Sequence, residues 1–168
     1  VYFCQGGMHT GIDKNQGVSE VRPMRGGESF GPNIDYLFIT ATDYFKRITI
    51  PKKIPVIGVI LSGMIQDGAL GAVYAMKSEG GLLLIQDPVS CSNDAASSMP
   101  LQTLARLYLM EQGIPWEKLP LGILPVGPAL RHYKDIQAVR KKRVVIAKPE
   151  DIGPIIIKRM REELAKRG

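Results

Sequence analysis

Two apolar stretches, Val56-Ile57-Gly58-Val59-Ile60-Leu61 and Leu82-Leu83-Leu84-Ile85, decide the fold. Each is apolar at successive positions, which is typical of a strand that helices cover on both faces. Between them lies a helical segment from about Asp67 to Ser78, followed by the turn Gly80-Gly81. A strand, a helix and a second strand within about 30 residues predict a right-handed crossover between parallel strands. The sequence therefore predicts the α/β class, with a mostly parallel sheet.

Upstream of the crossover, the sequence predicts a small β-hairpin and a helix. The hairpin joins His9–Ile12 to Val18–Val21, because Asn and Gly residues separate these two segments. Apolar residues at helical spacing predict a helix that begins after the capping residue Asn33 and ends near Arg47.

Downstream of the crossover, a third helix is expected to end at Gly113, and Lys118–Leu121 is predicted as a short edge strand. Val144–Ala147 is another apolar run. A basic helix is expected over Asp151–Arg167, with four apolar residues facing inward: Ile155, Ile156, Met160 and Leu164. Helices on both faces of the sheet predict a doubly wound, three-layer (Rossmann-like) arrangement with a small β-hairpin.

The composition indicates an ordinary globular domain. The chain has 168 residues, of which 45% are hydrophobic and 23% charged, so it is long enough to bury a core. No apolar run approaches the roughly 18 residues of a membrane span. Two cysteines, Cys4 and Cys91, are too few for a disulfide framework, which favours a cytoplasmic location.

The net charge of +6 belongs to the end of the chain. Residues 1–130 have 10 Lys/Arg and 11 Asp/Glu, whereas residues 131–168 have 12 and 5. No aromatic residues are interleaved with the basic clusters between Arg140 and Arg167, so the tail is interpreted as a solvated helix face and nucleic acid is not expected as a partner.

Ligands of open parallel sheets bind beyond the carboxyl ends of the strands, which here singles out the loops 62–67 and 86–98. Asp67 is the carboxylate where the first loop meets its helix. One interpretation is that Asp67 caps this helix. The other is that it orients a catalytic histidine, a role that needs a rigidly held carboxylate.

Five segments in order carry a resemblance to a known family. They are Val1-Tyr2-Phe3-Cys4-Gln5-Gly6-Gly7-Met8-His9, Pro32-Asn33-Ile34-Asp35-Tyr36-Leu37-Phe38, Ile60-Leu61-Ser62-Gly63-Met64-Ile65-Gln66-Asp67-Gly68-Ala69, Gly80-Gly81 with Gln86-Asp87-Pro88, and Ser98-Met99-Pro100. Together they resemble the CheB-type protein-glutamate methylesterases of bacterial chemotaxis. The third segment is similar to the family pattern Leu-Thr-Gly-Met-Gly-x-Asp-Gly-Ala. The resemblance runs from about Val1 to Leu121.

The resemblance implies a Ser-His-Asp hydrolase that removes methyl esters from glutamates of chemoreceptors and deamidates certain receptor glutamines. Asp67 matches the catalytic aspartate of the family, and Met64 matches a methionine that shapes the site. No metal and no cofactor are implied. A methyl-accepting chemoreceptor is the implied partner, and a receiver or methyltransferase domain is an implied neighbour in a full-length protein.

The family's serine and base histidine precede the segment that matches Val1, so the only triad member expected in this chain is Asp67. Val1–Cys4 reads as the middle of a buried strand, and we expect the sequence to begin inside a longer domain. A substitute set of Ser62, His9 and Asp67 is not expected, because residues 58–62 lack the Gly-x-Ser-x-Gly turn that exposes a nucleophile. Ester hydrolysis is therefore expected only if the upstream segment is supplied.

The sequence leaves alternatives open. A CheB-like regulatory or binding module without catalysis would have the same sheet. A nucleotide-binding domain is less well supported, since no Gly-x-Gly-x-x-Gly follows a strand. The expected division is a CheB-like methylesterase domain over residues 1–121 and a basic, partly helical extension over residues 122–168.

Overall fold

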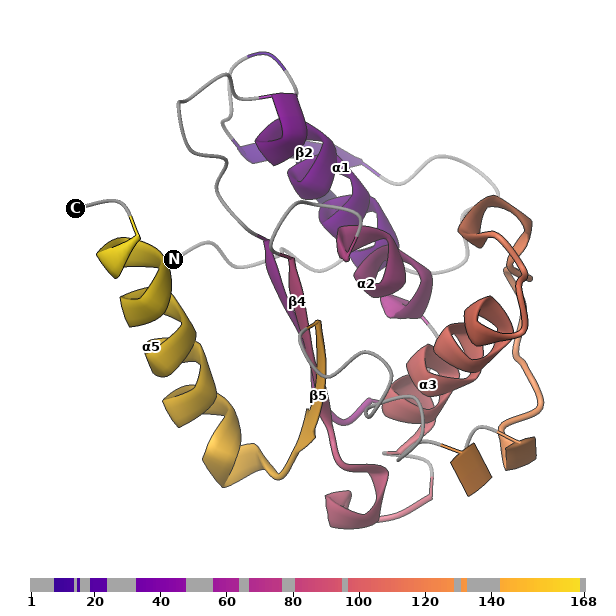
Figure 1. Ribbon diagram of the computed structural model, residues 1–168. Coiled ribbons are helices and arrows are strands. Elements are labelled where there is room, and N and C mark those ends of the chain that lie inside the picture. Colours follow the sequence, from indigo (N-terminus) through magenta and orange to yellow (C-terminus); the bar gives the residue numbers. More distant parts are fainter. Residues whose placement is uncertain are drawn as a thin grey trace.

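The computed structural model describes residues 8–13, 15, 19–23, 33–47, 56–63, 67–76, 81–94, 97–128, 131–132 and 143–166 (Figure 1). Within these residues, the main sheet has three parallel strands in the order β3 (Ile57–Ile60), β4 (Leu82–Gln86) and β5 (Val144–Ala147). The predicted α/β class with a parallel sheet is confirmed. The strand expected at Val1–Cys4 lies outside the described residues.

The predicted crossover joins β3 to β4 through α2 (Ala69–Ala75), which is shorter than expected. The two strands pair in parallel, with Ile57 opposite Leu82. All five residues of β4 are buried, because this strand lies between its two neighbours and beneath helices on both faces. The continuous apolar run in the sequence is explained by this position.

Helices cover the sheet on both sides (Figure 1). Leu83 belongs to the apolar cluster formed with α2 and α3 (Ser98–Glu111), whereas Leu84 belongs to the cluster formed with α5 (Pro149–Ala165). Both side chains have 0% exposure. Helix, sheet and helix are the three layers of the doubly wound fold, as predicted.

The predicted hairpin is also present. Strands β1 (Met8–Ile12) and β2 (Ser19–Pro23) pair in the antiparallel sense. The hairpin lies against α1 (Ile34–Arg47), whose bounds are those that the sequence predicts. The backbone N–H of Ile12 donates a hydrogen bond to Thr40 Oγ1 at 3.0 Å, so the hairpin is fixed to this helix.

The edge strand predicted at Lys118–Leu121 is wrong. Trp116–Lys118 forms a short 3₁₀ helix, and no strand follows it directly. The carbonyl oxygens of Pro120 and Gly122 accept hydrogen bonds from Arg106 Nη2 at 3.2 and 3.1 Å. Pro120 has no N–H to donate to a sheet, and a buried guanidinium uses the carbonyl groups that a strand would need.

The last helix lies where the sequence predicts it, but two of its four expected inward side chains face outward. Ile155 and Ile156 pack against the sheet, while Met160 is 53% and Leu164 is 64% exposed. The 17 residues of α5 rise about 25 Å, whereas the four residues of β5 span about 13 Å. The end of the helix therefore extends beyond the strand that it covers.

Residues 122–168 contribute a strand to the main sheet, because β5 pairs in parallel with β4 through Val144 and Leu83. The division of the chain at residue 121 stays a prediction. Among the helices of the described ranges, none has the length and apolar character that crossing a membrane requires.

Candidate active site at the carboxyl edge of the sheet

The loop that follows β3 is fixed to the end of β4. Gln86, only 5% exposed, accepts a hydrogen bond at its Oε1 from the backbone N–H of Ser62 at 2.9 Å. The Gln86 amide nitrogen in turn donates to Ser90 Oγ at 3.3 Å. The carbonyl oxygen of Gly63 accepts from the N–H of Met99 in α3 at 3.1 Å. These bonds connect both loops that the sequence singles out as candidate ligand sites.

Asp67 lies at the end of the first of these loops, and both of its carboxylate oxygens accept backbone hydrogen bonds. Oδ2 accepts from the N–H of Ile34 at 2.8 Å, and Oδ1 accepts from the N–H of Asp35 at 3.2 Å. Both donors belong to the first turn of α1, where backbone N–H groups have no partner within the helix. A carboxylate is favoured there because the helix dipole is positive at this end.

The simple interpretation of Asp67 as the cap of the helix that follows it is therefore wrong. The N-cap of α2 is Gly68, which has a φ of 90° and no side chain of its own with which to cap the helix. With this left-handed conformation, the backbone turns so that the Asp67 side chain reaches α1 instead. A Cβ atom at Gly68 would lie 2.8 Å from Ile34 Cγ2, so glycine also leaves room for the start of α1.

The start of α1 has a second polar cap. Asn33 Oδ1 accepts a hydrogen bond from the N–H of Tyr36 at 2.7 Å, as the sequence predicts. Three successive backbone donors, from Ile34 to Tyr36, are thus bound by two side chains. The backbone N–H groups of these three residues therefore all have acceptors, and two of them hold the Asp67 carboxylate.

A second aspartate, Asp35, lies beside Asp67 and was not singled out from the sequence. Its Oδ1 accepts a hydrogen bond from the N–H of Gly71 in α2 at 2.6 Å. Burial raises the pKa of the Asp35 carboxyl, and the neighbouring charge of Asp67 raises it further. The Gly71 N–H and the positive charge of Arg106 act in the opposite direction.

Arg106 of α3 is a buried cation near this pair, with only 1% exposure. Its Nη1 donates to the carbonyl oxygen and to Oε1 of Gln102, both at 3.2 Å. Burial lowers the pKa of Arg106, and the charge of Asp35 partly offsets this effect. Gln102 and Arg106 are four residues apart and so lie on the same face of α3. This spacing is the sequence signal from which a polar network on that face could have been predicted.

The other candidate residues divide into those that the structure describes and those that it does not. Met64 lies outside the described residues. His9 is in β1, opposite Arg22, and Ser62 is exposed after β3. The second histidine of the chain, His132, stacks on Tyr108, with their ring centroids 5.5 Å apart.

Cys91 has an environment that disfavours a nucleophilic thiolate. Burial and the charge of Asp87 raise the pKa of its thiol. The thiol also donates a hydrogen bond to the carbonyl oxygen of Asp87, with 3.8 Å between sulfur and oxygen. These surroundings give no support to a nucleophilic role for this cysteine.

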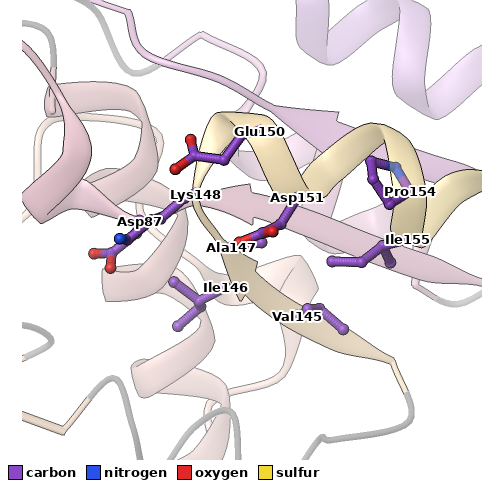
Figure 2. Close-up of a pocket in the computed structure, with 9 residues that line it drawn as sticks. All are labelled: Asp87, Val145, Ile146, Ala147, Lys148, Glu150, Asp151, Pro154 and Ile155. Carbon is purple, nitrogen blue, oxygen red and sulfur yellow. The ribbon is translucent and has the colours of Figure 1, made fainter.

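An open groove of about 650 Å³ lies along β5, between Asp87 at the end of β4 and the first two turns of α5 (Figure 2). Its charged lining residues are Asp87, Lys148, Glu150 and Asp151. Asp67 is not among the residues that line it. Within the ranges that the structure describes, no three His, Cys, Asp or Glu side chains are grouped as metal ligands would be.

The fold and the anchored carboxylate define an open parallel α/β protein with a candidate acid at the ligand-binding edge of its sheet. Residues 1–121 match the family model for CheB methylesterase, and the chain belongs to this family. The resemblance seen in the sequence is thereby confirmed, and the family supports a methylesterase-type function in chemotaxis. No curated protein matches the chain.

Proposed function

We propose that Asp67 is the aspartate of a Ser-His-Asp triad that hydrolyses glutamyl methyl esters on chemoreceptors. The observation that carries this proposal is the pair of backbone N–H groups, from Ile34 and Asp35, that hold the two oxygens of Asp67. A triad aspartate must be rigid in order to fix the tautomer and orientation of its histidine and to stabilise the imidazolium that forms. Two amides from one helix turn provide such rigidity.

The hydrogen bonds to Asp67 leave room for a histidine. An ionised carboxylate has about four acceptor positions, and the two amides of α1 use one on each oxygen. A remaining position can accept the Nδ1–H of an imidazole. The serine and the histidine would come from outside residues 1–168, because the corresponding family residues precede the segment that matches Val1.

The proposed reaction follows from these roles. The serine oxygen attacks the ester carbonyl while the histidine takes the serine proton. The histidine then gives this proton to the methoxide oxygen as its bond to carbon breaks, so that methanol leaves. Water hydrolyses the resulting acyl-enzyme by the same route, which regenerates the serine and leaves a glutamate. A glutamine side chain would react in the same way, with ammonia as the leaving group.

Further parts of the proposal rest on the family match alone. Met64 would shape the substrate site, and a methyl-accepting chemoreceptor would be the partner. A receiver or methyltransferase domain would be the neighbour in the full-length protein, and the cytoplasm would be the location. The reaction as written uses no metal and no cofactor.

Methanol release from a methylated receptor tests this function, using the protein together with its natural upstream sequence. We expect release by the wild type and a loss of release in Asp67→Ala. Asp43→Ala is the matched control, because Asp43 also links α1 to α2, through a hydrogen bond from the Tyr74 hydroxyl. Equal rates for wild type and Asp67→Ala would remove Asp67 from the mechanism.

A further inference from the structure

The position of Asp67 depends on another helix. Its two hydrogen-bond donors are the N–H groups of Ile34 and Asp35, which belong to α1, whereas Asp67 itself directly precedes Gly68 and α2. A shift of the first turn of α1 relative to α2 would therefore move both donors away from the carboxylate. Whatever fixes these two helix starts together also fixes Asp67.

The Asp35 side chain makes this connection. Its Oδ1 accepts from the N–H of Gly71 at 2.6 Å, so a residue of α1 caps the first turn of α2. The two aspartates are reciprocal caps, since Asp67 precedes α2 and binds α1 while Asp35 lies in α1 and binds α2. The approach is close, because a Cβ atom at Gly71 would lie 2.8 Å from both Cα and the carbonyl oxygen of Asp35.

A second carboxylate at this place has an electrostatic cost. Burial raises the pKa of Asp35, as does the charge of Asp67, and only the Gly71 amide, a weaker Gly68 backbone bond and the charge of Arg106 oppose the shift. Packing of the two helices alone would be served by an apolar side chain that carries no such cost. The presence of a carboxylate at Asp35, despite the free-energy cost of burying it, is explained by its hydrogen bond to the Gly71 N–H.

We propose that Asp35 is a positioning residue for Asp67: its bond to Gly71 holds the first turn of α1 where the N–H groups of residues 34 and 35 bind the Asp67 carboxylate. The consequence for catalysis rests on the proposed function. The positioning itself does not, because it is a property of the chain whether or not a serine and a histidine are supplied.

Proton NMR titration of backbone amides in the 168-residue chain tests the positioning directly. The shift of an amide proton bound to a carboxylate changes when that carboxylate is protonated. In the wild type, the Gly71 amide should follow Asp35, and the Ile34 amide should be protected from exchange by its bond to Asp67. In Asp35→Ala, we expect the Ile34 amide to exchange with solvent about 10-fold faster.

Two further variants make this test specific. Asp35→Asn keeps an oxygen that can accept from Gly71, so Ile34 should keep its slow exchange while Gly71 loses its titration. Asp43→Ala removes a different α1–α2 hydrogen bond and should leave the exchange rate of Ile34 unchanged. A folded Asp35→Ala variant with wild-type exchange at Ile34 would overturn the proposal. If Asp35→Ala does not fold, Asp35→Asn serves as the test. A Gly71 amide that still titrates in this variant would not be bound to the Asp35 carboxyl, and the proposal would be overturned.

Ester hydrolysis provides the second readout. Asp35→Ala should lower kcat by about 10- to 100-fold with KM nearly unchanged, because a displaced catalytic group affects the chemical step. Asp35→Asn should restore most of the rate. Unchanged kcat in Asp35→Ala would refute the positioning role. If the wild type itself releases no methanol, the proposed function fails, and the amide measurements at Ile34 and Gly71 alone decide the role of Asp35.

Discussion

Replacement of Asp67 by alanine should destabilise the start of α1, although Asp67 lies 33 residues after Ile34 in the sequence. The substitution removes the acceptor of two backbone N–H groups, those of Ile34 and Asp35. Loss of a capping side chain costs about 0.5–2 kcal/mol. Because Asp67 is partly buried, water replaces its oxygens incompletely, while the removal of a negative charge beside Asp35 offsets part of the loss. We therefore expect a decrease of about 1–2 kcal/mol in the free energy of unfolding.

Urea unfolding followed by circular dichroism measures this loss, and the midpoint should fall with an unchanged slope. Asp67→Asn should lose much less stability, because asparagine is as good a cap as aspartate. Hydrogen exchange identifies the helix involved, since the amides of Ile34 and Asp35 should exchange faster in Asp67→Ala. Wild-type stability of Asp67→Ala, or faster exchange at the start of α2 in place of α1, would refute the assigned capping role.

Three further predictions concern the surroundings of the site. Gly68→Ala should lower the free energy of unfolding by about 1–2 kcal/mol or more, because the φ of 90° and the nearby Ile34 side chain both disfavour a Cβ atom. Gly122→Ala is the control, since Gly122 has open space around it, and it should be nearly neutral in the same urea assay. Arg106→Lys should lower the free energy of unfolding by about 2–3 kcal/mol, since an ammonium cannot reproduce the hydrogen bonds of a buried guanidinium; an unchanged urea midpoint would contradict this. Burial, and next the hydrogen bond to the Asp43 carboxylate, raise the pKa of Tyr74 from 10.0 to about 12. The unfolded chain therefore releases this proton at lower pH than the folded protein, and the free energy of unfolding should fall as pH rises from 10 to 12. Urea midpoints of Tyr74→Phe should fall less steeply over this range, and identical slopes for both proteins would contradict the pKa shift.

The elements that the sequence predicted well are those whose signal is local and continuous. The apolar runs of β3 and β4 predicted the parallel crossover, because continuous apolar sequence is typical of a strand covered on both faces. The bounds of α1, Ile34–Arg47, followed from its apolar spacing and from the cap at Asn33. In these cases the residues that specify the element are the residues that form it.

The predictions fail where contacts with a distant part of the chain determine the local structure. Asp67 has the position of a cap for α2, but α1 offers its donors to the same carboxylate, and no local pattern distinguishes the two helices. Lys118–Leu121 has the composition of an edge strand, but Arg106 binds the carbonyl groups there. The apolar face of α5 predicts a buried stripe, but periodicity does not say where the covering sheet ends, and Leu164 lies beyond it.

The site was predicted in part for the same reason. The position of Asp67 at the carboxyl edge of the sheet follows from the pattern of strands and helices. It follows also from the resemblance to the CheB family, and the family match confirms this resemblance. The roles of Asp35 and Gln86 could not be predicted, because each depends on a hydrogen bond between elements that are distant in sequence. Met64, which lies outside the described residues, stays a prediction.

The most direct test of the central claim is kcat for methanol release by the Asp67→Asn variant, measured in the protein with its upstream sequence and a methylated receptor. Asparagine still caps α1, so the fold should remain intact, but its side-chain amide lacks the charge that stabilises an imidazolium and can favour the wrong histidine tautomer. If Asp67 is the triad aspartate, kcat should fall by about 10³- to 10⁴-fold while the urea midpoint stays near that of the wild type. A variant that releases methanol at the wild-type rate would show that Asp67 only caps a helix, and would contradict the proposed mechanism.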